Sequence, residues 1–346
     1  MIPFEYRTPK NLKEVHATLK EFGADAKLIA GGTALVIMMK QRLVRPTCLV
    51  SLGSVRGLNG IEVKDGGLSI GGLATHRAVE DSALVRRRLP MLAETYHHVA
   101  TLRVRNMATV GGGLAHADPN MDPPPSLIAL GATVKATSPN GSRTIPLDEF
   151  FKDYYETVLN PDEIITEVMV PKVLPNTGAA YIKFLPRTAD DYATVSAAAV
   201  LTLDKTLKTI ADVRIALGSV GVTPIRATAA EAVLRGQRHA HASRDEGEVE
   251  EEHGRDADQP ELLGERGVDE VGLEVRDQRR PVDRLERPTA DSGAAVAAVR
   301  DRVQALYELV RVAVLAVLEQ AVDRAVDLLV GPRLQPDRDA LLDAGQ

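Results

Sequence analysis

Hydrophobic and polar residues along the first 150 positions follow helical spacing in some segments and form short apolar runs in others. Helical spacing predicts a helix over residues 11–22, with Thr8 as its cap and Pro9 in its first turn. Short apolar runs and caps predict strands at 27–30, 48–52 and 68–72, and helices at 33–41, after Thr75 and at 91–98. Residues 133–146 predict a hairpin that turns at Asn140-Gly141. Because strands and helices do not alternate strictly, the pattern favours an α+β fold over a doubly wound one.

After about residue 179 the chain changes to longer, strand-like stretches. Three of them, at 180–185, 193–203 and 212–220, predict an antiparallel sheet that forms a second, smaller domain. The segment 170–177 is the predicted linker. The predicted domains are therefore a first domain of two α/β lobes at 1–172 and the start of a sheet domain at 177–236.

Two glycine clusters are the most informative local feature: Ala30-Gly31-Gly32-Thr33-Ala34 and Thr109-Val110-Gly111-Gly112-Gly113. Each is predicted to be a loop that follows a short strand, with backbone N–H groups uncovered by side chains, as a diphosphate requires. The first also precedes a predicted helix, whose N-terminus favours an anion. Neither cluster fits the Rossmann or P-loop spacing. One glycine pair alone is typical of a turn, but the second cluster leads into a proline-stiffened loop with two carboxylates. We interpret the pair as one nucleotide or flavin site.

Composition limits the other function classes. The formal net charge of −6 and a pI near 5.8 argue against nucleic-acid binding. The N-terminus lacks the pattern of a signal peptide, and the longest apolar run, at 312–318, is too short for a membrane span, so we expect a cytoplasmic protein. The one cysteine, Cys48, is expected to be buried at a strand, and no histidine or cysteine spacing predicts a metal site.

Several motifs together resemble a known family. They are Phe4-Glu5-Tyr6, Ala30-Gly31-Gly32-Thr33, Leu68-Ser69-Ile70-Gly71-Gly72, Arg105-Asn106-Met107-Ala108-Thr109-Val110-Gly111-Gly112, Pro161-Asp162-Glu163-Ile164-Ile165 and Ala216-Leu217-Gly218-Ser219. In this order and spacing, the chain resembles the FAD-binding (medium) subunit of the molybdenum hydroxylases, the family of aerobic carbon monoxide dehydrogenase and xanthine dehydrogenase. The resemblance covers about the first two thirds of the chain.

The resemblance implies a set of FAD-binding residues. These are Ala30, Gly31, Gly32, Thr33, Ala34, Thr109, Val110, Gly111, Gly112, Gly113, Asp122, Ile165, Lys183 and Tyr192. The two clusters would wrap the diphosphate, and Asp122 would contact a ribose or ribityl hydroxyl, while Asp118 is read as a loop cap. Lys183 and Tyr192 would lie near the isoalloxazine, where a lysine stabilises reduced flavin and a tyrosine shields one face of the ring.

The resemblance also implies function and partners. The chain would be an electron-transfer flavoprotein that receives electrons from 2Fe–2S centres on a small subunit, after oxidation of substrate at a molybdenum cofactor on a large subunit. Together they would form a dimer of heterotrimers. Residues 103–106 would face a partner or orient the second cluster, or else be solvated charge at a strand edge. Two alternatives remain: a stand-alone flavin oxidase or reductase of the same fold, and a nucleotide-binding module without redox turnover.

The last third, 237–346, departs from the family. Lysine, phenylalanine, methionine and isoleucine are absent beyond Lys208, Phe184, Met169 and Ile225 respectively, and Arg, Ala, Asp and Glu replace them. Because the missing residues use A/T-rich codons, this composition favours a shifted reading frame in GC-rich DNA. The alternative is a genuine charged linker followed by an amphipathic helix over about 299–317. We place no functional residue in this region.

Overall fold

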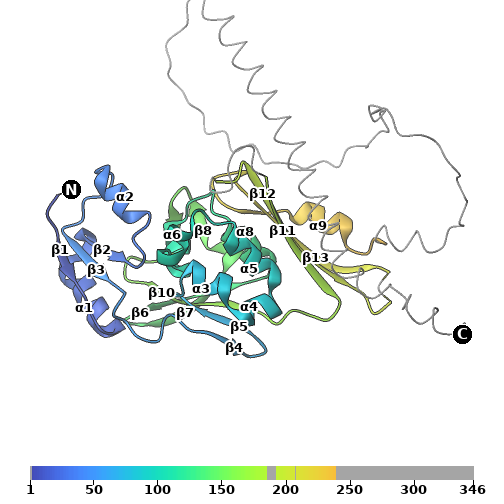
Figure 1. The fold of residues 1–346 in the computed structure, drawn as a ribbon, viewed down its shortest axis with the longest axis horizontal. Coiled ribbons are helices and arrows are strands. Elements are labelled where there is room, and N and C mark those ends of the chain that lie inside the picture. Colours follow the sequence, from blue (N-terminus) through green and yellow to red (C-terminus); the bar gives the residue numbers. More distant parts are fainter. Residues whose placement is uncertain (1, 185–191, 207, 239–346) are drawn as a thin grey trace, which may run out of the picture. The chain divides into compact units, whose positions relative to one another are not determined.

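Three sheets of three to five strands organise the part of the chain that the computed structural model describes, which is residues 2–184, 192–206 and 208–238 (Figure 1). The first sheet and five-stranded second sheet lie in the two predicted α/β lobes. The third is the antiparallel sheet expected after residue 177. The fold is therefore the α+β arrangement that the sequence predicts. The atypical region beyond Arg238, including the predicted helix at 299–317, lies outside the described residues.

The first lobe is a parallel sheet in the order β1-β3-β2. Its elements are β1 (Glu5–Arg7), α1 (Leu12–Phe22), η1 (Gly23–Asp25), β2 (Ala26–Ile29), α2 (Leu35–Lys40) and β3 (Cys48–Ser51). Val15 of α1 packs on Cys48 and Val50, and Cys48 is fully buried as expected. The cap of α1 is Asn11 and not Thr8, because the Asn11 side chain accepts the N–H of Glu14 at 3.0 Å.

The second lobe is an antiparallel sheet in the order β4-β5-β10-β6-β7. Its strands are β4 (Ile61–Lys64), β5 (Gly67–Gly71), β6 (Thr133–Ser138), β7 (Gly141–Pro146) and β10 (Ile164–Val170), with η2 (Leu147–Glu149) and a small pair, β8 (Phe151–Asp153) and β9 (Glu156–Thr157). Its helices are α3 (His76–Asp81), α4 (Ala83–Arg88), α5 (Pro90–His97), α6 (Leu102–Met107), α7 (Val110–His116) and α8 (Pro123–Ala129). The hairpin β6-β7 and the Thr75 cap are confirmed, whereas the central strand β10 is not among the predicted elements.

The second glycine cluster differs from the expected loop after a strand. The segment before it is the helix α6, and Val110 to Gly113 form the first turn of α7. Three glycines weaken a helix by about 1 kcal/mol each. The Thr109 side chain compensates by accepting the N–H of Gly112 at 3.1 Å, as an N-cap does. The local hydrogen bonds therefore outweigh the low helix propensity.

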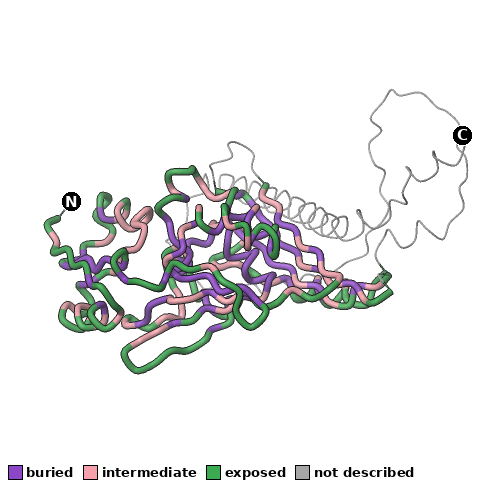
Figure 2. Tube along the Cα trace, turned by 60° about the horizontal axis from the view of Figure 1, so that its bottom comes forward, coloured by how far each residue is buried: buried purple, intermediate pink, exposed green. Residues whose placement is uncertain are grey.

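The third sheet has the order β11-β12-β13-β14, with β11 (Thr177–Phe184), β12 (Val195–Leu203), β13 (Ile210–Gly218), β14 (Ile225–Arg226) and the helix α9 (Thr228–Leu234). Both faces of β12 are buried along most of the strand, and Figure 2 colours buried residues purple along the trace. On β12, Val195, Ala197 and Ala199 pack with residues of α9, whereas Ala198 joins the core of the second lobe. Burial on both faces explains the nearly continuous apolar run of this strand.

Within the described ranges, no helix is long and apolar enough to cross a membrane.

Candidate functional site

The first glycine cluster connects β2 to α2 and is shaped by contacts that only glycine allows. A Cβ on Gly31 would lie 1.9 Å from the carbonyl oxygen of Met107, so the backbone of α6 touches this loop directly. Gly32 has φ +71°, in the left-handed region. Among the described residues, the N–H groups of positions 31–34 have no hydrogen-bond partner, and all four residues are partly exposed. The loop therefore presents four consecutive free donors.

The backbone N–H groups of the second cluster are already bonded within the protein. Val110 donates to Ala74 O at 2.9 Å, and Gly111 donates to Gly72 O at 2.8 Å. Gly112 donates to the Thr109 hydroxyl, and Gly113 to the Thr109 carbonyl at 2.9 Å. Because that hydroxyl accepts a bond from Gly112, its own hydrogen stays available for donation.

The two clusters lie against each other although about 80 positions separate them in the chain. A Cβ on Gly112 would be 3.7 Å from the Ala30 Cβ, and Gly31 lies against Met107 and Ala108. Ile165 is close on the other side, because a Cβ on Gly72 would be 2.2 Å from the Ile165 carbonyl oxygen. The structure thus brings together the residues predicted to contact the diphosphate.

Arg105 holds α6 in this position. Its side chain is nearly buried, and it donates to Glu80 at 2.9 Å and to the carbonyls of Val99 and Ala100 at 2.9 and 2.8 Å. Glu80 also accepts from Arg77 and contacts His97 Nδ1 at 2.8 Å. Residues 103–106 therefore lie in a helix and not at a strand edge, and within it Arg105 points inward whereas Arg103 is exposed.

Asp122 and Lys183 form a buried ion pair with Asp122 Oδ2 3.0 Å from Lys183 Nζ. Tyr181 donates its hydroxyl to Asp122 Oδ1 at 2.6 Å, and Lys183 also donates to the His98 carbonyl at 2.9 Å. Burial raises the pKa of Asp122, and the Lys183 ammonium opposes that rise. Tyr181 was not predicted, although it shares a face of β11 with Lys183 at a spacing of two residues.

Tyr192 binds Asp118 and makes no hydrogen bond with the Asp122–Lys183 pair. Its hydroxyl donates to Asp118 Oδ2 at 3.0 Å, while its side chain stays largely exposed. Asp118 caps its own loop, as expected, by accepting the N–H of Asn120 at 3.0 Å. The structure adds a second role, the contact with the phenol, that the loop sequence gave no reason to expect.

His76 lies behind the second cluster. It is 5% exposed, and its Nδ1 has no hydrogen-bond partner among the described residues. Its Nε2 is 3.5 Å from the position that a Cβ on Gly113 would occupy, and its ring meets Tyr96 edge to face at 5.0 Å. Burial lowers the pKa of His76 to about 4, so the ring is neutral at physiological pH.

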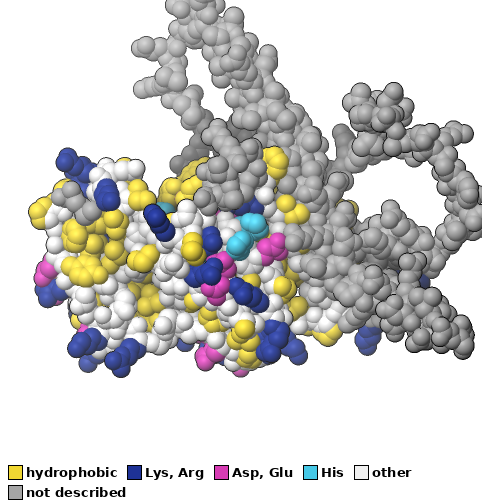
Figure 3. Space-filling model, in the orientation of Figure 1, with side chains coloured by type: hydrophobic (Ala, Val, Ile, Leu, Met, Phe, Trp, Pro, Cys, Tyr) yellow, Lys and Arg dark blue, Asp and Glu magenta, His cyan; other side chains and the backbone are white. Residues whose placement is uncertain are grey.

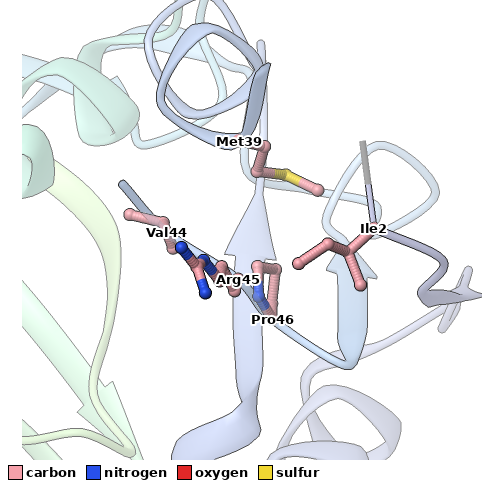
Figure 4. Close-up of a pocket in the computed structure, with 5 residues that line it drawn as sticks. All are labelled: Ile2, Met39, Val44, Arg45 and Pro46. Carbon is pink, nitrogen blue, oxygen red and sulfur yellow. The ribbon is translucent and has the colours of Figure 1, made fainter. Parts of the chain in front are cut away.

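The described surface of the first lobe has no buried ion pair and no buried, hydrogen-bonded carboxylate like those around Asp122 and Asp118. Figure 3 shows hydrophobic side chains at the surface of the first lobe. The exposed hydrophobic residues of this lobe include Tyr6, Ile37 and Leu43. A small pocket lined by Ile2, Met39, Val44, Arg45 and Pro46 holds one guanidinium among apolar side chains, without an acid or base pair (Figure 4). No cluster of three metal-ligating side chains occurs in the described ranges.

Two sequence families match this chain. Residues 2–173 match the family described as "FAD binding domain in molybdopterin dehydrogenase", and residues 180–246 match the "CO dehydrogenase flavoprotein C-terminal domain".

Individual relatives agree with these matches. The carbon monoxide dehydrogenase medium chain of Hydrogenophaga pseudoflava is 39% identical over 239 residues, which cover 68% of this chain and 82% of that protein. The 6-hydroxypseudooxynicotine dehydrogenase complex subunit alpha of Paenarthrobacter nicotinovorans is 38% identical, over 67% of this chain and 77% of its own. A solved carbon monoxide dehydrogenase from Hydrogenophaga pseudoflava superposes with a TM-score of 0.66 at 40% identity, covering 70% of this chain and 84% of that one.

Proposed function

The chain belongs to the family of FAD-binding subunits of the molybdenum hydroxylases, and from that premise we propose how its residues hold FAD. FAD supplies the redox chemistry of such a subunit, and the protein supplies binding, orientation and electrostatics. The residues of the two clusters fit a diphosphate, because the first presents free amides and the second a threonine hydroxyl. This juxtaposition is the observation that carries the proposal.

The two clusters contribute differently. We assign the amide donors to residues 31–34, whose N–H groups are free. Ala30 and the cluster 109–113 line the same site. Thr109 adds its hydroxyl, and Gly112 lets the two clusters lie close together, because a Cβ on it would be 2.7 Å from the Thr109 hydroxyl oxygen and 3.7 Å from the Ala30 Cβ. The carbonyl of Ile165 lies against Gly72, whose own carbonyl lies next to Gly111 of the second cluster.

Asp122, Lys183 and Tyr192 are assigned to the remainder of the cofactor. The Asp122 carboxylate already accepts from Tyr181 and Lys183, and its remaining lone pairs can accept a ribityl or ribose hydroxyl. Lys183 would add positive charge near the flavin, which would favour its reduced form, although the Asp122 carboxylate 3.0 Å away offsets part of that charge. Tyr192, with its exposed side chain, would cover one face of the isoalloxazine and control access to it.

The partners are a large subunit with the molybdenum cofactor and a small subunit with 2Fe–2S centres, in a dimer of heterotrimers. Support comes from the relatives, two of which are named medium chains of carbon monoxide dehydrogenase. In this chain, residues 1–172 form the FAD-binding domain and residues 177–236 begin the sheet domain. Electrons would reach FAD from the small subunit and leave to an external acceptor.

The purified full chain tests the proposal. We expect a visible flavin absorbance band, release of FAD on denaturation, and copurification of two further subunits from the native host. A flavin-free chain would contradict the cofactor assignment. Flavin with turnover of an organic substrate in the absence of other subunits would instead support a stand-alone oxidase or reductase.

A further inference from the structure

Asp118 is held rigidly in the loop between α7 and α8. It is 5% exposed, its Oδ1 accepts the N–H of Asn120 at 3.0 Å, and its carbonyl accepts the N–H of Met121 at 3.2 Å. One carboxylate oxygen is thus fixed by the loop itself. The other, Oδ2, accepts the hydroxyl of Tyr192, and the carboxylate also interacts with the side chain of Tyr155.

The Tyr192 hydroxyl donates its hydrogen bond to this second oxygen, Oδ2. Its hydroxyl donates to Asp118 Oδ2 at 3.0 Å across 74 positions of sequence, while the residue remains 61% exposed. An exposed ring makes few packing contacts, so its orientation is set mainly by the hydrogen bond at its end. The partly buried surroundings of the hydroxyl and the charge of Asp118 together raise the pKa of Tyr192 to about 12, with smaller contributions from Tyr155 and Asp122.

The turn between β8 and β9 also contacts the loop that holds Asp118. Tyr155 donates its N–H to the Ala117 carbonyl at 3.2 Å, and its ring lies 5.0 Å from that of His116. Ala117 and Tyr155 both have left-handed φ values, of 53° and 55°. Side chains other than glycine rarely adopt this conformation, so the two backbones meet in one specific arrangement beside Asp118.

We propose that Asp118 is a positioning residue that fixes the phenol of Tyr192, and with it the orientation of the Tyr192 ring. The role in electron transfer rests on the proposed function, because it assumes that Tyr192 covers the flavin. The fixation of the phenol does not rest on it.

The first test reads the phenol without the flavin. The full chain is labelled with 3-fluorotyrosine, and Tyr192 is assigned in the fluorine NMR spectrum as the signal lost in Tyr192→Phe. In Asp118→Asn, which keeps an oxygen for Asn120, Tyr192 should titrate about one pH unit lower than in the parent. Asp153→Asn is the control, because it removes a nearby exposed charge that caps Tyr154 and should leave Tyr192 unchanged. Equal titration in the parent and Asp118→Asn overturns the proposal.

The second test uses a double-mutant cycle on the rate of flavin reoxidation. If Asp118 acts through Tyr192, then Asp118→Asn, Tyr192→Phe and the double variant should change the rate by the same factor, at unchanged FAD content. If the two single effects multiply in the double variant, Asp118 acts by another route and the proposal is wrong. A shifted titration with no effect of Tyr192→Phe on reoxidation supports the positioning and instead contradicts the flavin role of Tyr192.

Discussion

Single glycines in the two clusters differ in how strongly the structure requires them. Gly31 is required by the backbone of α6, which leaves no room for a Cβ, and Gly32 by its left-handed φ. Gly113 is different, because a Cβ there would meet His76 Nε2 and Met121 Sδ at ordinary contact distances of 3.5 and 3.7 Å. Sequence alone does not distinguish these three glycines, since the difference lies in contacts with distant segments.

Alanine substitutions should distinguish Gly31, which has no room for a Cβ, from Gly113, which has room for one. Gly31→Ala should destabilise the chain by about 1–3 kcal/mol, because the methyl group overlaps the Met107 carbonyl, and should reduce FAD retention. Gly113→Ala should keep FAD and raise stability by up to about 1 kcal/mol through better helix propensity. Urea unfolding and flavin content measure both effects. Equal loss of FAD in the two variants would contradict the assignment.

His76 predicts a pH dependence of stability. Its folded pKa of about 4 lies below the ordinary value of 6.5, so the unfolded chain binds the proton more strongly between these two values. The contribution of His76 is complete above pH 6.5 and falls by up to about 3 kcal/mol as the pH drops towards 4. Unfolding free energies of the parent and His76→Gln, measured across this range, should diverge in slope. Parallel curves would show that His76 is not the responsible group.

At the scale of elements, α6 links the interior of the second lobe to the first glycine cluster. Its Arg105 bonds to Glu80 and to two carbonyls, and its last residue, Met107, touches Gly31. A helix of six residues has little stability of its own, so these contacts decide its position.

Arg105→Lys should therefore loosen α6 although it keeps the charge. A lysine has no planar fork and cannot reach Glu80 and both carbonyls together, so we expect a loss of about 2 kcal/mol and faster FAD dissociation. Arg103→Lys, on the exposed side of the same helix, is the matched control and should behave like the parent. Thermal unfolding and FAD release after dilution are the measurements. Equal FAD dissociation rates in the two variants would show that the position of α6 does not affect FAD binding.

Local signals decided which elements could be predicted. The hairpin β6-β7 has a turn signal at Asn140-Gly141, and the Thr75 cap precedes its helix directly, so both follow from sequence. The strand β10 pairs with β5 and β6 from distant parts of the chain. The helix α6 does have a local cap, because the Thr101 side chain accepts the N–H of Val104 at 3.4 Å, but its position depends on the contacts of Arg105. The same holds in the site: the clusters are visible as motifs, whereas the bonds of Asp118, Tyr181 and Arg105 arise only from tertiary contacts.

At the scale of the whole molecule, the proposed site joins two lobes. Residues 30–34 follow β2 of the first lobe, and residues 109–113 cap and begin α7 of the second lobe, so a ligand between them would stabilise both lobes. FAD added to the flavin-free chain should raise its unfolding temperature, with a gain of about 2.7 kcal/mol at a hundredfold excess over Kd. Differential scanning fluorimetry measures the shift, and adenosine monophosphate is the control that lacks the diphosphate and flavin. No shift with FAD would contradict a site between the lobes.

The composition of residues 237–346 leads to a genetic prediction. Resequencing the coding DNA should recover a frame in which lysine and isoleucine return after residue 236. The match to the flavoprotein C-terminal domain ends at residue 246, close to the change in composition. A clean read without such a frame would establish the charged region as genuine.

The internal hydrogen bonds of the second cluster have a consequence for the order of biogenesis. Val110, Gly111, Gly112 and Gly113 find their acceptors within the polypeptide, so the first turn of α7 forms without any ligand. This part of the binding surface can therefore fold before FAD binds. We therefore expect synthesis and folding to come first and flavin loading second, so that a cell short of riboflavin would accumulate a folded apoprotein that is ready to be loaded.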